Sequence, residues 1–217
     1  MPHPDLSDCS AMVPPDDARP YHHGDLPNAL RAAAADLIAE RGVSGFSLRE
    51  VARRAGVSHA APTHHFGDAR GLLTSLAIEG FRHLDAALAT AIAGVDDPID
   101  QLARTGRAYV EVARSSPGPS ALLFRHDLLD TDDPAYGECG DGAHGRLTAV
   151  LVAVRDTYNP DLDVDLAAGL CWSAMQGLVQ LHPNMAEVAE RHDRRLADPG
   201  DLAERFARLL AEGFVAR

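Results

Sequence analysis

Four polar side chains within a short stretch of the sequence are of types that contact nucleic acids. Arg49 is followed by His59, Thr63 and His64, and each can form hydrogen bonds with phosphate oxygens or base edges. A merely solvated surface would have the same residue types. Which of the two applies depends on the elements that position these side chains.

Local signals in this stretch predict two short helices joined by a tight turn. Ser47 and Glu50 have the spacing of a capping box, so a helix is expected to begin at once after the serine. Gly56 can end this helix in the left-handed conformation. Ser58 is then expected to cap a second helix, with Pro62 in or near its first turn. This is the layout of a helix-turn-helix.

The order Ala55-Gly56-Val57-Ser58, followed by His64-His65-Phe66, strongly resembles the DNA-binding domain of TetR/AcrR-family transcriptional regulators. The resemblance runs from about residue 21 to residue 81. It implies that the polar residues of the second helix and its surroundings contact DNA, and that the cap serines can also hold phosphate. The DNA-binding residues expected are Arg19, Ser47, Arg49, Ser58, His59, Ala60, Thr63, His64 and His65.

Two residues depart from the pattern of that family. Thr63 stands where the family usually has tyrosine, and Ala69 stands where it usually has lysine. Both usual residues contact DNA phosphates. An alternative is therefore a helical adaptor of the same fold that has lost DNA binding.

The charge of the chain is divided unevenly. The net charge is −12, made up of −4 in residues 1–18, +2 in residues 19–83 and −10 in residues 84–217. Only the helix-turn-helix segment is positive, as expected for a DNA-binding module attached to a domain with another task. We expect a tail at 1–18, a DNA-binding domain at 19–67 and a dimerisation and ligand-binding domain at 68–217.

Composition and motifs argue against several protein classes. The sequence has no membrane-spanning run and no signal peptide, so a cytoplasmic location without membrane association is expected. The three cysteines lack paired spacing, which favours free thiols over disulfides or a metal site. No catalytic motif or Gly-rich phosphate loop occurs, so no catalytic residue, metal or cofactor is expected.

Helical periodicity continues to the end of the chain, and no alternating strand pattern appears, so the fold class expected is all-α. Helices are expected at residues 26–41, beginning after a cap at Asp25, and over about twenty-five residues after a cap at Asp68. Further helices are expected at 98–115, at 121–129 after a break at 117–119, from about 147 to 159, at 165–181, and from 199 onwards. Residues 131–137 are expected to form a loop.

The last two predicted helices have apolar faces suited to pairing with a second copy of the chain. The dimer residues expected are Leu170, Ala174, Leu178, Leu202, Phe206 and Leu209. In the TetR family the corresponding helices form a four-helix bundle between two subunits. The run 172–177 also resembles that family's Trp-His-Gly ligand-domain signature, with Gln176 in place of the histidine.

A largely apolar small molecule is the expected ligand of the acidic domain, since such sites are mostly apolar with a few polar groups. The ligand-binding residues expected are Tyr109, Phe124, His126, Trp172, Met175 and Gln176, although ordinary core packing could account for each. The resemblance thus predicts a homodimeric regulator, a repressor that a ligand releases from a near-palindromic operator in double-stranded DNA.

Overall fold

The computed structural model describes residues 25–215, and this part of the chain is helical without any strand. The helices are α1 (Leu26–Arg41), η1 (Val43–Gly45), α2 (Leu48–Arg54), α3 (Ala61–Phe66), α4 (Ala69–Ile92), α5 (Pro98–Ser115), α6 (Pro117–Ser120), α7 (Pro134–Tyr158), α8 (Val164–Arg191) and α9 (Pro199–Val215). The all-α fold expected from the sequence is confirmed. Within the described residues no helix combines the length and apolarity needed to cross a bilayer.

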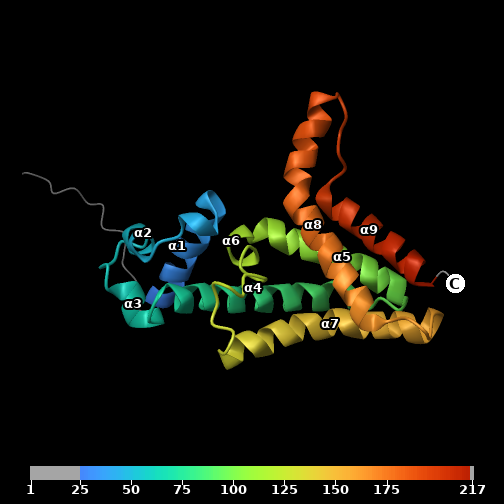
Figure 1. Ribbon diagram of the computed structural model, residues 1–217, viewed down its shortest axis with the longest axis horizontal. Helices are drawn as coiled ribbons and strands as arrows, with labels where there is room; N and C mark the ends of the chain where they lie inside the picture. Colours follow the sequence, from blue (N-terminus) through green and yellow to red (C-terminus); the bar gives the residue numbers. More distant parts are fainter. Residues whose placement is uncertain (1–24, 216–217) are drawn as a thin grey trace, which may run out of the picture.

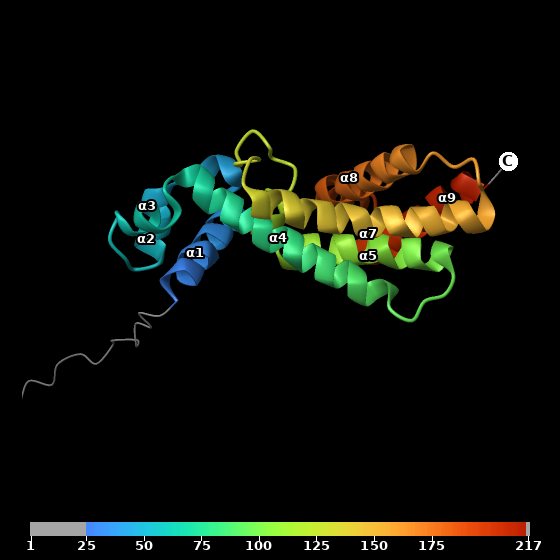
Figure 2. The ribbon, with the colours of Figure 1, turned by 90° about the horizontal axis from the view of Figure 1, so that it is seen from below.

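The molecule is elongated, with α1, α2 and α3 gathered at one end (Figure 1). Helix α4 runs from this group into a larger bundle formed with α5, α7, α8 and α9 (Figures 1 and 2). We call the group of α1–α3 the head and the larger group the bundle. Because one continuous helix joins them, a tilt of α4 would move the head relative to the bundle.

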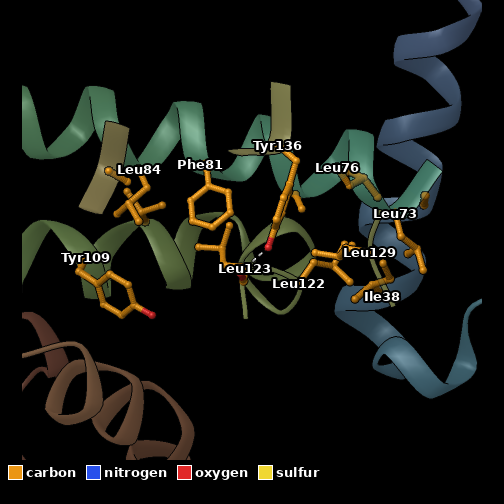
Figure 3. Packing of buried hydrophobic residues seen from close by; sticks show 14 of the residues in the cluster. Ile38, Leu73, Leu76, Phe81, Leu84, Tyr109, Leu122, Leu123, Leu129 and Tyr136 are labelled. Carbon is orange, nitrogen blue, oxygen red and sulfur yellow. Dashed lines mark hydrogen bonds between the residues drawn. The ribbon is translucent and has the colours of Figure 1, made fainter. Parts of the chain in front are cut away.

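A continuous apolar core extends from the head into the bundle. In the part of this core that Figure 3 draws, Ile38 of α1 lies near Leu73 and Leu76 of α4 on one side, and Tyr109 of α5 lies on the other. Between them Phe81 and Tyr136 meet edge to face, with ring centroids 5.7 Å apart. All of these side chains are buried.

Several helix starts follow the predicted caps. Ser47 accepts a hydrogen bond from the backbone N–H of Glu50 at 3.2 Å, and Asp68 accepts one from Gly71 at 2.9 Å. Gly42 and Gly56 have positive φ angles of 70° and 68°, as expected for residues that end helices in the left-handed region.

Two other predicted caps are wrong. Asp25 precedes α1, but its side chain makes no capping hydrogen bond. The second helix of the pair begins at Ala61 after Ala60, so Ser58 does not cap it. The carbonyl of Ser58 instead accepts a hydrogen bond from the N–H of Ala61, which places a turn where the helix was expected to start. Pro62 lies in the first helical turn, as predicted.

Between α5 and α7 the predicted break is helical and the predicted helix is not. Residues 117–119 form most of the one-turn helix α6, because a proline at a first helical position needs no N–H. Residues 121–129 form consecutive turns rather than a helix. Helix α7 already begins at Pro134, capped by Asp133 through the N–H of Ala135 at 2.8 Å, so the expected loop at 131–137 is shorter.

Helix α8 is longer than its pattern suggested. Asp163 caps it, and it continues beyond residue 181, through Pro183, to Arg191. Proline removes one backbone hydrogen bond, but good helix formers follow it. In Figure 1 the carboxyl-terminal half of α8 stands clear of the other helices, with only the chain that returns to α9 beside it.

Candidate nucleic-acid interface and ligand site

Helix α3 presents a polar surface at the outer end of the head. Thr63, His64 and His65 are all exposed on it, with the two histidine rings edge to face at 5.1 Å. Phe66, at the end of the same helix, packs partly buried against the core. The polar side chains are therefore free to contact another molecule while the phenylalanine fixes the helix to its own domain.

The turn before α3 extends this surface. Ser58, His59 and Ala60 are exposed there, and Ser47 is exposed at the start of α2. The structure thus brings together on the head every predicted DNA-binding residue that it describes. Arg19 lies outside the described residues.

The carboxylate of Glu50 ties two arginines of α2 in place. Arg53 donates to it at 2.7 and 2.8 Å and Arg54 at 3.3 Å, while Arg54 also binds Glu40 at 2.6 Å. The hydrogen bonds from Arg53 are the largest cause of a pKa of about 2 for Glu50. A complete capping box would also have the backbone N–H of Ser47 donating to the Glu50 carboxylate. This second bond is absent among the hydrogen bonds of residues 25–215, because the carboxylate oxygens accept from the arginines instead.

Arg49 differs from its neighbours on α2. It is exposed and, within the described part of the chain, makes no hydrogen bond or ion pair. Arg53 and Arg54 are largely neutralised by carboxylates, so Arg49 is the arginine of α2 whose charge is available to a phosphate.

Three of the predicted ligand residues surround a small internal cavity. Tyr109, Trp172 and Met175 line it, and its volume is about 20 Å³. This is room for about one water molecule, so an organic ligand could enter only if the helices moved apart. Tyr109 donates a hydrogen bond to Gln176 Oε1 at 2.6 Å, and burial raises the pKa of the tyrosine. Gln176 therefore fixes the ring that closes one side of the cavity.

A larger hollow lies on the other side of Trp172. Its volume is about 370 Å³, within the range of small-molecule sites. The predicted residues Phe124 and His126 line it together with Trp172, and the Phe124 and Trp172 rings are 5.9 Å apart. Five of the six predicted ligand residues thus line two adjacent spaces, with Trp172 common to both, whereas Gln176 lines neither and contacts Tyr109 instead.

The sequence interpretation missed eight residues of this hollow. The aromatic and titratable ones among them are Phe81 of α4 and Tyr136, Asp141 and His144 of α7. An aspartate before a proline at 133–134 was the available signal that α7 begins early, and it would have placed three of these residues on one helix.

The predicted dimer residues separate into exposed and buried sets. Leu170, Phe206 and Leu209 are exposed, with 44, 36 and 64% of their surfaces accessible. Ala174 and Leu202 are half-buried. Leu178 is only 4% exposed within its own chain, so the prediction that it lies on an open face of α8 is wrong. It faces inward because it belongs to the core of the bundle.

The described residues contain no group of three or more His, Cys, Asp or Glu side chains that could hold a metal ion. His64 and His65 are adjacent on α3, and neighbours on a helix point about 100° apart, which makes them a poor chelating pair. The remaining functional features are the polar surface of the head and the aromatic hollow of the bundle.

Comparison with known proteins agrees with this arrangement. Residues 30–76 match the model of bacterial regulatory proteins of the tetR family. The chain has a TetR-family amino-terminal domain. The match includes α2 and α3, so the exposed polar surface lies on this TetR-type domain. None of the curated proteins matches the chain significantly.

Solved structures extend the similarity to the whole fold. A Rhodococcus sp. RHA1 protein of unknown function is 27% identical, with a TM-score of 0.71, over 91% of this chain and 100% of its own. A tetR-family regulatory protein from Rhodococcus RHA1 is 20% identical, with a TM-score of 0.70, over 89% and 98%. The regulator FadR from Bacillus subtilis, solved with stearoyl-CoA, is 19% identical, with a TM-score of 0.69, over 86% and 98%. The arrangement of a helix-turn-helix domain and a larger helical domain is therefore that of TetR-family regulators.

Proposed function

We propose that this protein is a cytoplasmic, homodimeric transcriptional regulator that binds a near-palindromic operator. The observation that carries the proposal is the exposed polar surface of α3 on a TetR-type domain, together with Arg49 of the neighbouring helix α2, which makes no hydrogen bond or ion pair within residues 25–215. We place this DNA-binding domain at residues 19–67 and the dimerisation and ligand-binding domain at 68–217, preceded by a tail at 1–18.

The residues of the head take different parts in this proposal. His59, Thr63 and His64 lie against the base edges or phosphates of the major groove, and Arg49 pairs with a phosphate. Ser47, Ser58, Ala60 and His65 contact the sugar-phosphate backbone around them, and Arg19 enters the adjacent minor groove as an arm. Two observations support these assignments. Within residues 25–215 Arg49 makes no hydrogen bond or ion pair, and every one of these DNA-binding residues except Arg19, which lies outside that range, is exposed.

The proposed dimer forms through α8 and α9. Leu170, Phe206 and Leu209 are large apolar residues exposed on these two helices, and a second copy of the same face would cover them. Two heads related by a two-fold axis can read successive major grooves when their centres are about 34 Å apart. A palindromic operator follows from this symmetry.

The proposed regulation is release of a repressor by a small, largely apolar molecule bound in the bundle. Phe124 and His126 of the hollow lie in the stretch 121–130, whose carbonyls at Leu129 and Asp127 accept hydrogen bonds from Arg70 at 2.6 and 3.3 Å. Arg70 is at the start of α4, directly after the head. A ligand that favours another position of this stretch would therefore change the distance between the two heads of the dimer.

Gel-shift titration with the DNA upstream of the protein's own gene tests the proposal. The parent protein should bind at physiological salt more weakly than at low salt, because phosphate contacts release counterions. Arg49→Ala and His64→Ala should each weaken operator binding at least tenfold, which is about 1.4 kcal/mol. Arg155→Ala, at a partly exposed arginine of α7 far from the head in sequence, is the control and should bind as the parent does.

Operator binding that neither Arg49→Ala nor His64→Ala weakens would contradict the proposed interface. Absence of binding to any upstream fragment would favour the adaptor of the same fold. The observation behind that alternative is the pair Thr63 and Ala69, which are both exposed at the head and lack the phosphate-contacting groups usual in the family.

A further inference from the structure

We propose that the hollow on the outer side of Trp172 binds a hydrophobic aromatic cation, with Asp141 as its counter-ion. The proposal rests on the ligand-responsive regulator proposed above, and it specifies where the ligand lies and what charge it has. Asp141 was not among the residues that the sequence indicated.

Aromatic rings from four separate parts of the chain form the walls. Phe81 comes from α4, Phe124 from the turns after α6, Tyr136 from α7 and Trp172 from α8. Phe81 and Tyr136 form one edge-to-face pair at 5.7 Å, and Phe124 and Trp172 form another at 5.9 Å. Figure 3 shows Phe81 and Tyr136 side by side above Leu123. Aromatic faces attract cations through the quadrupole of the ring, which favours a positively charged guest.

The charge around the hollow also favours a cation. Asp141 is exposed at its edge and, within residues 25–215, makes no ion pair or hydrogen bond. No arginine lines the hollow. Two arginines lie next to lining residues in the sequence, and each forms an ion pair with another carboxylate. Arg125 pairs with Asp127 at 2.8 Å, and Arg146 pairs with Asp85 at 2.6 Å. An anionic ligand would therefore meet the only fixed charge of the lining with the wrong sign.

Two glycines of α7 leave the floor of the hollow open. Gly137 and Gly140 both line it, although glycine is a poor helix former. A Cβ atom added at Gly140 would meet only the ring of Phe81, at an ordinary 3.9 Å, and one added at Gly137 would meet nothing within 4 Å. A Cβ atom could thus be added at either position without a clash, and a longer side chain there would extend into space that the ligand needs.

The hollow is connected to the head through its own wall. The backbone N–H of Asp130, a few residues after Phe124 and His126, donates to Thr74 Oγ1 of α4 at 2.8 Å. With the Arg70 hydrogen bonds described above, this fixes the wall to the amino-terminal part of α4. A guest between Phe124 and Trp172 is therefore placed to change how α4 is held.

Trp172 is the only tryptophan of the chain, so its fluorescence reports on the hollow and on the small cavity, both of which it lines. The test titrates the full-length protein with tetraphenylphosphonium and with tetraphenylborate, two ions of the same shape and opposite charge. We expect saturable quenching by the cation, with an affinity at least tenfold higher than for the anion. Asp141→Asn should reduce this preference to less than threefold. Equal affinity for the two ions would overturn the proposal.

A matched pair of glycine variants separates binding in the hollow from binding elsewhere on an acidic surface. Gly140→Leu should weaken phosphonium binding at least tenfold because the new side chain fills the hollow. Gly142→Leu, on the same helix but outside the lining and with nothing within 4 Å of its Cβ position, should bind as the parent does. Retained binding in Gly140→Leu, with circular dichroism showing both variants folded, would refute the site.

Gel-shift titration of the same samples distinguishes failure of this inference from failure of the proposed function. A protein that binds its operator but shows no preference for the phosphonium cation would retain the regulator and lose this site. A protein that binds the cation with the predicted effects of Asp141→Asn and Gly140→Leu, but no DNA, would retain the site and favour the adaptor.

Discussion

The head and the last two helices of the bundle distribute their apolar residues in opposite ways. In the head, large side chains such as Leu30, Leu37 and Val51 are fully buried and the exposed surface is polar. In α9, the small residues Ala203, Ala207 and Ala211 face the core. The large residues Phe206 and Leu209 of the same helix are exposed.

This difference shows that the head covers its own large apolar side chains, whereas several of those on α8 and α9 are exposed within one chain. Close packing of α9 on α5 requires small side chains: a Cβ atom at Gly106 would lie 3.1 Å from that of Ala207. The larger apolar residues are left on the outer side, where they remain in water unless another molecule covers them. A second copy of the chain is the occupant that our proposal requires.

The largest effect should come from a charge placed on this outer face. Leu209→Glu would leave an uncompensated carboxylate in the proposed dimer interface, at a cost of roughly 3 kcal/mol or more, which is over a hundredfold in the dissociation constant. Sedimentation velocity at micromolar concentration should then show monomers. Ala149→Glu, at an exposed position of α7, is the control and should sediment as the parent does. A parent protein that is itself monomeric would contradict the comparison.

The next largest effect concerns the joint between the two regions. A Cβ atom at Gly118 of α6 would lie only 2.3 Å from the carbonyl oxygen of Ala35 in α1, so Gly118→Ala should force the helices apart and cost about 1–3 kcal/mol. Thermal unfolding should shift downwards by several degrees. Gly142→Ala, in open space on α7, should instead be stabilising by about 1 kcal/mol. Equal shifts of both variants would mean that this contact does not fix the head.

A smaller effect is expected on the head itself. Thr63→Tyr would extend a hydroxyl group far enough to donate to a phosphate, so both operator and scrambled duplex should bind more tightly by about 1 kcal/mol. Titration of both duplexes at one salt concentration measures this. Loss of operator binding alone would instead show that Thr63 meets a base directly.

The smallest effect tests whether the interior of the bundle is closed. Burial raises the pKa of the Cys171 thiol to about 12, so little thiolate forms at pH 8 and alkylation should be very slow. In a Cys9→Ser background, mass spectrometry should find half-buried Cys139 modified well before Cys171. In urea the two cysteines should be alkylated at similar rates, because unfolding exposes both. Rapid modification of Cys171 in the folded protein would show that the cavity beside Trp172 opens to solvent.

Local chemistry in the sequence determined much of the head and of the helix framework. Ser47 and Asp68 act as caps where their side chains suggested, and α1, α4, α5 and α9 begin where the pattern placed them. These features depend on residues within a few positions of one another, which is why a single sequence reveals them. The exposure of the polar residues on α3 follows from the same amphipathic pattern.

Only the tertiary structure decided which apolar residues are covered and where a ligand has room. Leu178 and Leu209 belong to similar stripes in sequence, yet one is in the core and the other in water, because neighbouring helices cover only one of them. The aromatic hollow combines Phe81, Phe124, Tyr136 and Trp172 from four parts of the chain. Their meeting depends on how distant helices pack, and helical periodicity within one segment contains no information about that.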